Sequence, residues 1–345
     1  MKRIVLCFDG TWNRPDDTHP ADTRVETNVR RFFDSIHATG GDGVAQMAWY
    51  NEGVGTSWFN KFAGGAFGFG LDKHIVEGYE QLAKTYEDGD EVYILGFSRG
   101  AYTARSLVGM IRNCGLIRPG HAANGLSLMA YGIYRTRDDK QDSAAARAFR
   151  SMFSREIPIK FLGVWDTVGA LGIPIDVSAV VAFDRALYEF HDTELSGIVK
   201  NAYQAVALDE HRIDYNITLW NPKSKPEQTV EQRWFIGAHA DVGGGYNDRR
   251  LSDITLQWMQ EKATGLDLAL DRITAGADNY KSAPVDSFAQ FLGGAYAKLK
   301  GKPFFRSVLQ TAFGNEILDP TIGLRRADTA LNYAPANQVL PPVGP

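Results

Sequence analysis

The sequence predicts an α/β fold in which a mainly parallel central sheet is flanked by helices. Three observations support this prediction: short apolar runs without alternation, amphipathic helical patterns between them, and a polar or glycine-rich loop directly after each run. Apolar runs of this kind are typical of strands that are buried on both faces. Strands that alternate with helices form parallel sheets, and the sites of such sheets lie at the carboxyl ends of the strands.

The individual elements follow from these patterns. Apolar residues spaced i, i+4, i+8, i+11 and i+15 predict a helix over 71–86, and a second helix is expected over 99–112, ending near Gly115. Three long stretches, 118–156, 172–200 and 265–315, do not alternate, and we expect them to be helical insertions that form cap or edge elements of one domain spanning 1–345. The predicted strands are 4–8, 47–50, 91–96, 159–165 and 233–237, with a weaker sixth at 215–220.

Composition excludes several classes of protein. Hydrophobic residues make up 44% of the 345 residues and charged residues 23%, which is the balance of a globular protein. A formal charge of -4 gives no reason to expect nucleic acid, whose binders usually carry a basic face, and two cysteines cannot form a disulfide framework. The first apolar run is too short for a signal peptide, so we expect a cytoplasmic protein, or one that a dedicated secretion system exports.

A G-x-S-x-G motif occupies residues 96–100, between the predicted strand 91–96 and the predicted helix that follows. This strand–turn–helix setting is that of the nucleophile elbow of the α/β-hydrolase fold, which predicts Ser98 as a nucleophile. The backbone N–H of Arg99, at the start of the helix, is then expected to stabilise developing negative charge on a substrate oxygen. The alternative is that Ser98 only caps the helix, where serine is favoured for local reasons.

A serine hydroxyl needs a base to accept its proton and a carboxylate to orient that base. His239, which follows the predicted strand 233–237, is the expected base, with His211 as the competing histidine. Asp166, which ends the strand 159–165, is the expected carboxylate, and Asp241 is the alternative. The order Ser98, Asp166, His239 along the chain is that of this fold.

The loop after the first strand is expected to complete the site. A second backbone donor for the substrate oxygen comes from a neighbouring strand end in this fold, so Gly10 or Thr11 is a candidate. Asp9 is expected to order the same loop through hydrogen bonds to its backbone.

These motifs together resemble a known family, the catalytic domain of the bacterial type VI secretion lipase effectors of the first class, which belongs to a wider α/β-hydrolase family of bacteria and fungi. The resemblance covers about residues 1–250. It implies phospholipase or carboxylesterase chemistry through a Ser98–Asp166–His239 triad, with a lipid or small-molecule ester as substrate and without a metal or cofactor. The motifs that carry it are Phe8-Asp9-Gly10-Thr11-Trp12-Asn13, Gly53-Val54-Gly55-Thr56, Gly96-Phe97-Ser98-Arg99-Gly100-Ala101, Val164-Trp165-Asp166-Thr167-Val168-Gly169 and His239-Ala240-Asp241-Val242-Gly243-Gly244-Gly245-Tyr246.

Two alternatives stay open. The effectors carry a large extra region for membrane engagement, whereas this chain has room only for modest insertions, which keeps a soluble short-chain carboxylesterase or thioesterase among the interpretations. A binding module that retains a hydrolase fold without turnover is the other, because a fold does not imply a function. Contact with a membrane surface is expected, if it occurs, at the apolar part of the 172–200 insertion.

Overall fold

The computed structural model describes residues 1–10, 25–53, 69–121, 125–136, 143–169, 195–220, 227–311 and 315–337. Thr11, residues 54–56 of the second motif and most of the 172–200 insertion lie outside these described residues.

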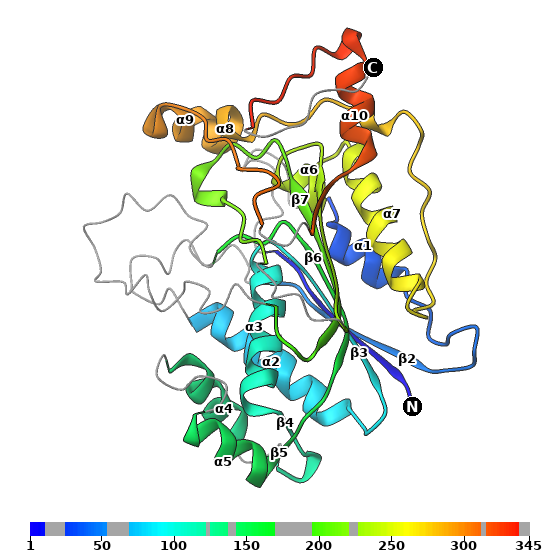
Figure 1. Ribbon diagram of the computed structural model, residues 1–345, viewed down its shortest axis with the longest axis vertical. Helices are drawn as coiled ribbons and strands as arrows, with labels where there is room; N and C mark the ends of the chain where they lie inside the picture. Colours follow the sequence, from blue (N-terminus) through cyan, green and yellow to red (C-terminus); the bar gives the residue numbers. More distant parts are fainter. Residues whose placement is uncertain are drawn as a thin grey trace.

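The centre of the molecule is a sheet of seven strands in the order β2-β1-β3-β6-β7-β8-β9, and every neighbouring pair in it is parallel (Figure 1). The predicted mainly parallel sheet flanked by helices is therefore confirmed. Its strands are β1 (Arg3–Phe8), β2 (Gln46–Asn51), β3 (Glu91–Phe97), β6 (Ile159–Trp165), β7 (Val199–Ala207), β8 (Thr229–Phe235) and β9 (Glu316–Leu318).

The weaker sixth strand was predicted wrongly. Residues Ile213–Tyr215 form a short 3-10 helix, and Ile217 makes only an isolated bridge to Val168. The sixth and seventh strands are instead β7 and β9, at the centre and at the edge of the sheet. Strand β7 lacks a continuous apolar run because polar residues interrupt it, including the fully buried Gln204.

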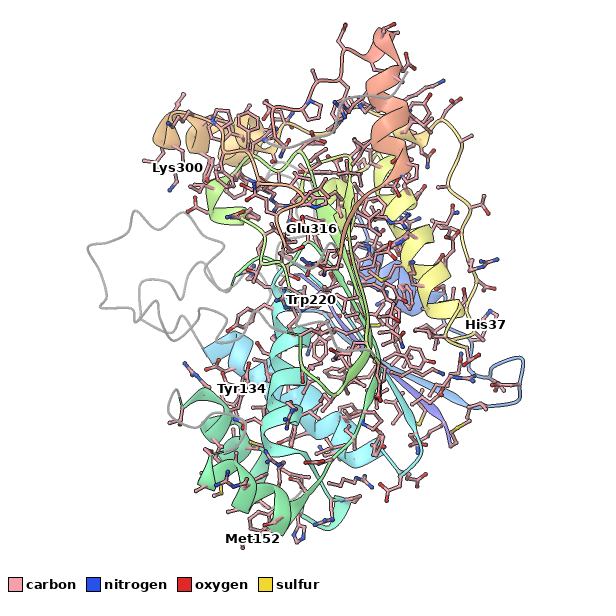
Figure 2. All side chains as sticks on the ribbon, viewed as in Figure 1. His37, Tyr134, Met152, Trp220, Lys300 and Glu316 are labelled. Carbon is pink, nitrogen blue, oxygen red and sulfur yellow. The ribbon has the colours of Figure 1, made fainter. Side chains whose placement is uncertain are left out.

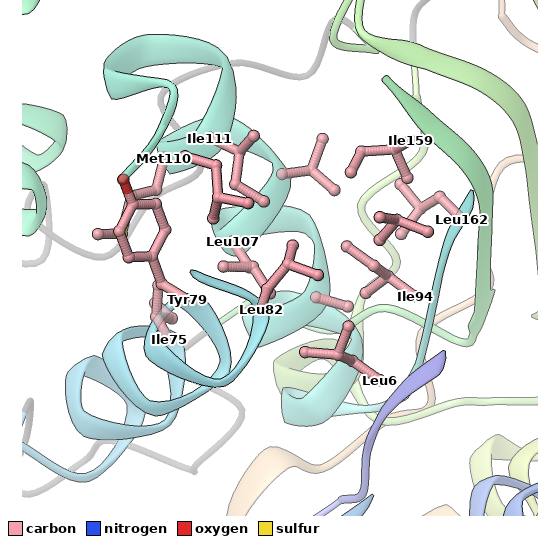
Figure 3. Packing of buried hydrophobic residues seen from close by; sticks show 14 of the residues in the cluster. Leu6, Ile75, Tyr79, Leu82, Ile94, Leu107, Met110, Ile111, Ile159 and Leu162 are labelled. Atoms are coloured by element: carbon pink, nitrogen blue, oxygen red, sulfur yellow. The ribbon is translucent and has the colours of Figure 1, made fainter. Parts of the chain in front are cut away.

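Helices cover both faces of the sheet. Alternate side chains of β1 separate the two layers: Ile4, Leu6 and Phe8 pack with α2 and α3, whereas Val5 and Cys7 pack with α1 and α7. Figure 3 shows the first of these cores, where Leu107 and Ile111 of α3 meet Ile94 of β3 and Ile159 and Leu162 of β6. The covering helices are α1 (Asn28–Asp34), α2 (Phe69–Thr85), α3 (Arg99–Cys114) and α7 (Arg250–Thr264).

The sequence segments outside this alternation go to opposite ends of the molecule (Figure 1). The 118–156 stretch forms α4 and α5, followed by β5, which pairs with β4; the two helices pack beside α2 and α3, away from α6. The 265–315 stretch carries α8 and α9 at the end where α6 also lies. The remaining elements are α4 (Leu126–Arg135), α5 (Ala144–Phe153), β4 (Leu116–Ile117), β5 (Ser154–Arg155), α6 (His239–Gly243), α8 (Ser287–Gln290), α9 (Ala295–Lys300) and α10 (Pro320–Ala327).

The edge strand β9 is fixed to the sheet by buried polar contacts. Glu316, labelled in Figure 2, accepts a hydrogen bond from the indole N–H of Trp234 on β8 at 2.8 Å. The side chain of Gln232, also on β8, binds both backbone groups of Trp220, whose ring packs over the Arg105 guanidinium at 4.9 Å. The chain far beyond the last predicted strand is therefore part of the same sheet.

The strand order places a topological switch point between β1 and β3. The chain leaves β1 towards α1 on one face and leaves β3 towards α3 on the other, and these two strands are neighbours. Such a switch point opens at the carboxyl ends of the strands and is where parallel sheets bind their ligands. Residues Asp9 and Ser98 follow the two strands at this point.

Candidate active site

Ser98 occupies the sharp turn between β3 and α3. Its backbone has φ 57° and ψ −121°, a region that residues other than glycine rarely adopt and that costs on the order of 1–3 kcal/mol. The Ser98 N–H donates to the carbonyl of Trp165 at 3.1 Å, which fixes the turn to the end of β6. The Ser98 hydroxyl makes no capping hydrogen bond to α3, so the helix-cap interpretation of this serine is wrong.

Glycines let the elements around Ser98 approach closely. A Cβ atom on Gly100 would lie 2.1 Å from the carbonyl oxygen of Phe8, and one on Gly96 would lie 2.5 Å from the carbonyl oxygen of Gly100. A Cβ atom on Gly10 would lie 3.2 Å from the Cβ of Ser98, so the loop after β1 borders the serine directly. The two glycines of the G-x-S-x-G motif therefore have a steric role in positioning the serine.

Asp166 follows β6 with a φ of 38° and is completely buried. Its carboxylate accepts four hydrogen bonds: Oδ1 from the Ala207 N–H at 2.8 Å and Arg306 Nη1 at 2.6 Å, and Oδ2 from Arg306 Nη2 at 3.0 Å and His239 Nδ1 at 2.6 Å. Burial alone opposes ionisation of Asp166, but the charge of Arg306 and the bond to His239 outweigh it and hold the pKa of Asp166 below its usual range.

His239 begins α6 and lies almost completely buried against two aromatic rings. Its imidazole packs against the ring of Phe97, with the centroids 4.6 Å apart, and against the ring of Tyr215 at 5.2 Å. An ionised Asp166 only accepts hydrogen bonds, so Nδ1 of His239 is the donor in the pair and the tautomer with a free lone pair on Nε2 is the one that the pair favours for a neutral imidazole. Such an imidazole can accept a proton from a nearby hydroxyl.

The three predicted residues follow the carboxyl ends of β3, β6 and β8, three parallel strands of the same sheet. Asp166 and His239 are hydrogen-bonded, and Ser98 is joined to this pair through its neighbours, because its N–H binds Trp165 and the ring of Phe97 packs on His239. The competing residues lie elsewhere in the network. The His211 ring contacts Phe304 and Phe305, and Asp241 accepts the N–H groups of Ala238 and Val285.

Asp9 links the first residues after β1 to α1's N-cap and to β2. Asp9 Oδ2 accepts hydrogen bonds from the Thr27 hydroxyl at 2.6 Å and the Tyr50 hydroxyl at 2.5 Å. Asp9 Oδ1 accepts from the Gly10 N–H at 2.6 Å, so this donor is engaged within the loop. The Arg99 side chain is buried, and burial lowers its pKa to about 10.

Sequence reasoning missed three charged residues of this region. One of them, Arg306, binds Asp166. The other two, Glu210 and Arg212, form an ion pair beside His239. Glu210 Oε2 accepts hydrogen bonds from the backbone N–H of His239 at 3.2 Å and from Arg212 Nη2 at 2.8 Å. The stretch that holds this pair reads as a helix end with solvated side chains, yet Glu210 is 0% and Arg212 6% exposed. Burial raises the pKa of Glu210, and Arg212 overcomes that effect and lowers it to about 2. The signal available was the apolar run just before this stretch, which is the end of β7.

In the part of the chain that the structure describes, no group of three or more His, Cys, Asp or Glu side chains is arranged to hold a metal ion. None of its helices has an apolar stretch long enough to cross a bilayer.

The fold and the strand-end geometry define an α/β protein of the hydrolase type. Residues 2–262 match the family described as T6SS, Phospholipase effector Tle1-like, catalytic domain, and the chain belongs to this family. It is 32% identical over 245 residues to the uncharacterized protein YEL023C of Saccharomyces cerevisiae, a match that covers 64% of this chain and 33% of that protein.

Two solved structures are similar at low identity. One is an uncharacterized protein from Pseudomonas aeruginosa, with 18% identity, a TM-score of 0.42, and coverage of 88% of this chain and 51% of the other. The second is the Tle1 effector bound to the VgrG spike of the type 6 secretion system, with 19% identity, a TM-score of 0.38, and coverage of 71% and 51%. The chain thus spans about a third of the yeast relative and about half of each of these structures.

Proposed function

We propose that the protein is a serine hydrolase that cleaves carboxylic esters, with lipid acyl esters as its substrate class. Ser98 is the nucleophile, His239 the general base and Asp166 the carboxylate that orients it. The observation that carries this proposal is the Asp166–His239 hydrogen bond of 2.6 Å, formed beside a serine held at φ 57° at the switch point of the sheet. Membership of a phospholipase effector family supports the lipid part of the proposal.

The proposed reaction has two halves. In the first, Ser98 Oγ attacks the ester carbonyl carbon while His239 Nε2 takes the hydroxyl proton, and the leaving alcohol then recovers that proton as the acyl–Ser98 ester forms. In the second, His239 removes a proton from water, whose oxygen attacks the acyl carbon. The bond from that carbon to Ser98 Oγ then breaks, the carboxylic acid leaves, and His239 returns the proton to Ser98 Oγ. Asp166 remains ionised throughout and stabilises the imidazolium that forms in each half.

Backbone donors stabilise the tetrahedral oxyanion in this scheme. The Arg99 N–H lies in the first turn of α3, at the end of the helix where the helix dipole favours negative charge. The second donor is proposed at Gly10 or Thr11. For Gly10, this requires its N–H to exchange Asp9 Oδ1 for the substrate oxygen.

The first prediction concerns Ser98 itself. Ser98→Ala should abolish labelling by a fluorophosphonate probe and lower kcat for a chromogenic short-chain ester by on the order of 10⁴–10⁶, because no acyl-enzyme can form. Ser151→Ala, on the exposed side of α5, is the matched control and should label and turn over like the unchanged protein. Turnover that survives in Ser98→Ala would remove this residue from the mechanism.

Hydrolysis of a lipid panel, followed by product mass, tests the substrate class. Release of fatty acid from phospholipid vesicles, absent in Ser98→Ala, is the expected result. Cleavage of soluble esters or thioesters alone would favour the short-chain alternative. A protein that binds lipid but yields neither labelling nor product would be the non-catalytic module.

A further inference from the structure

Arg306 lies outside the region that matches the family, yet it reaches the centre of the site. The family match ends at residue 262, and Arg306 follows α9 in the 265–315 segment. Its side chain is 0% exposed, and it binds Asp166, which lies 140 positions earlier in the sequence. A fully buried arginine is rare unless it is paired, and this one is paired with the proposed orienting carboxylate.

The guanidinium of Arg306 makes two kinds of contact. Nη1 and Nη2 bind the two oxygens of Asp166 in a fork at 2.6 and 3.0 Å. The same two nitrogens donate to the carbonyls of Ala207 at 2.8 Å and Tyr215 at 2.5 Å. The carbonyls fix the guanidinium plane independently of Asp166, so Arg306 presents its fork in a set direction.

This direction matters for His239. The fork and the Ala207 N–H occupy three of the acceptor positions of Asp166, and the fourth, on Oδ2, faces His239 Nδ1. A carboxylate without the fork could rotate about its Cβ–Cγ bond and present a different oxygen to the imidazole. The base in a serine hydrolase loses most of its efficiency when its orienting hydrogen bond is lost, because the wrong tautomer then forms.

We infer that Arg306 is a positioning residue for the reaction: it fixes the carboxylate of Asp166 against His239, and the chain beyond the family match thereby completes the active site. This inference rests on the proposed triad. Arg306 touches neither the substrate carbonyl nor Ser98 in this scheme, so it acts through the residues that it binds, above all Asp166.

The charges around the pair set the expected pH effect. Arg306 faces Asp166, and the Glu210–Arg212 ion pair faces His239. Glu210 accepts a hydrogen bond from the backbone N–H of His239. Removing Arg306 takes one positive charge from beside a coupled Asp–His pair and leaves Glu210 in place. The pair then binds protons more readily, so the acidic limb of the kcat/KM profile should move to higher pH.

The test compares three variants of the full chain. Arg306→Met should lower kcat on a chromogenic ester by on the order of 10- to 100-fold, the loss typical of partners that orient a reacting group, with KM nearly unchanged. Its acidic limb should shift to higher pH. Arg306→Lys keeps the charge but not the fork, so it should keep the position of the limb and still lose kcat.

Arg325→Met is the matched control, because Arg325 is an equally buried arginine of the C-terminal segment that binds the carbonyls of Tyr280 and Ser282 away from the triad. It should lower stability without moving the pH profile. If Arg306→Met does not fold, the kcat of Arg306→Lys tests the inference. A wild-type kcat in Arg306→Lys would overturn it. A folded Arg306→Met with an unshifted acidic limb also overturns it, whereas activity in Ser98→Ala would instead overturn the proposed function.

Discussion

Two backbone conformations carry the strain of the site. Ser98 and Asp166 both have positive φ, 57° and 38°, and neither is a glycine. Hydrogen bonds hold both residues in place. The Ser98 N–H donates to the carbonyl of Trp165, and the Asp166 carboxylate accepts four hydrogen bonds. Strain of this kind persists only where the surroundings over-determine it, and it concentrates at functional sites. The packing that holds Ser98 depends on the absence of a Cβ at Gly100.

Gly100→Ala should therefore damage both folding and activity. The new methyl group would meet the carbonyl oxygens of Phe8 at 2.1 Å and Asp9 at 2.6 Å, and backbone atoms cannot yield as a flexible side chain can. We expect a loss of about 1–3 kcal/mol in the free energy of unfolding, typical of overpacking, as α3 moves away from β1. Thermal and urea unfolding measure the first effect, and the fluorophosphonate labelling rate measures the second.

Gly132→Ala is the control for this change. Gly132 is an exposed residue of α4 with nothing within 4 Å of its would-be Cβ. Alanine in a helix is favoured over glycine by about 0.5–1 kcal/mol, so this variant should be slightly more stable and equally active. If Gly100→Ala behaves like Gly132→Ala, the close approach of α3 to β1 is not what positions Ser98.

At the scale of elements, sequence patterns predicted the bounds of those strands and helices that local signals determine. The strand β6 was predicted with its observed bounds and α3 nearly so, because an apolar run, a turn and a helical period are all local signals. Strand β7 was missed because Gln204 interrupts its apolar run. The buried Gln204 side chain is satisfied by a hydrogen bond that it accepts from the hydroxyl of Thr167 at 3.0 Å, and Thr167 is distant in sequence.

Missing β7 also explains the wrong interpretation of the charged stretch after it. Glu210 and Arg212 look solvated when no strand precedes them, whereas at a central strand end they are buried as an ion pair. The Arg306–Asp166 contact had no local signal at all, since its two residues are 140 positions apart. Sequence therefore predicted the three proposed triad residues but not the groups that hold them in place.

The short helix α6 carries a charge whose effect depends on pH. Asp241 Oδ2 accepts the N–H groups of Ala238 and Val285, both at 2.9 Å, and burial raises the pKa of Asp241 to about 7. The folded protein thus holds this proton more tightly than the unfolded chain does. Stability from Asp241 is present at low pH and is lost as pH rises from about 4 to about 7.

Asp241→Asn should remove this dependence while keeping both hydrogen bonds, because the amide oxygen can accept from the same N–H groups. The variant should be more stable than the unchanged protein at pH 8, by at most a few kcal/mol, and the difference should shrink towards pH 5. Urea unfolding at the two pH values measures it. Asp241→Ala removes the oxygen that accepts both hydrogen bonds and should be destabilised at both pH values. Equal gains in stability for Asp241→Asn at pH 5 and pH 8 would contradict a buried titrating carboxyl here.

At the scale of the whole molecule, the folding unit is longer than the family match. The match ends at residue 262, but the segment beyond it supplies the edge strand β9 and several buried partners of the sheet's carboxyl end. Tyr333 donates to Asp209 at 2.9 Å, and the Asn337 amide binds the carbonyls of Leu208 and Arg306. These contacts satisfy polar groups that would otherwise be buried without partners, which costs about 1–3 kcal/mol for each group.

A chain that ends at Gly265, the C-cap of α7, should therefore not form a stable domain. It would keep the whole family match but lose the contacts of Arg306 with Asp166, of Glu316 with the Trp234 indole and of Tyr333 with Asp209. We expect it to be cleaved rapidly in limited proteolysis, to unfold without a cooperative transition and to show no fluorophosphonate labelling. A chain that ends at Asn337 keeps every one of these contacts and should match the full protein in all three measurements. Cooperative unfolding and labelling in the shorter chain would mean that residues 2–262 fold and assemble the site alone, and that the C-terminal segment only adds to a finished domain.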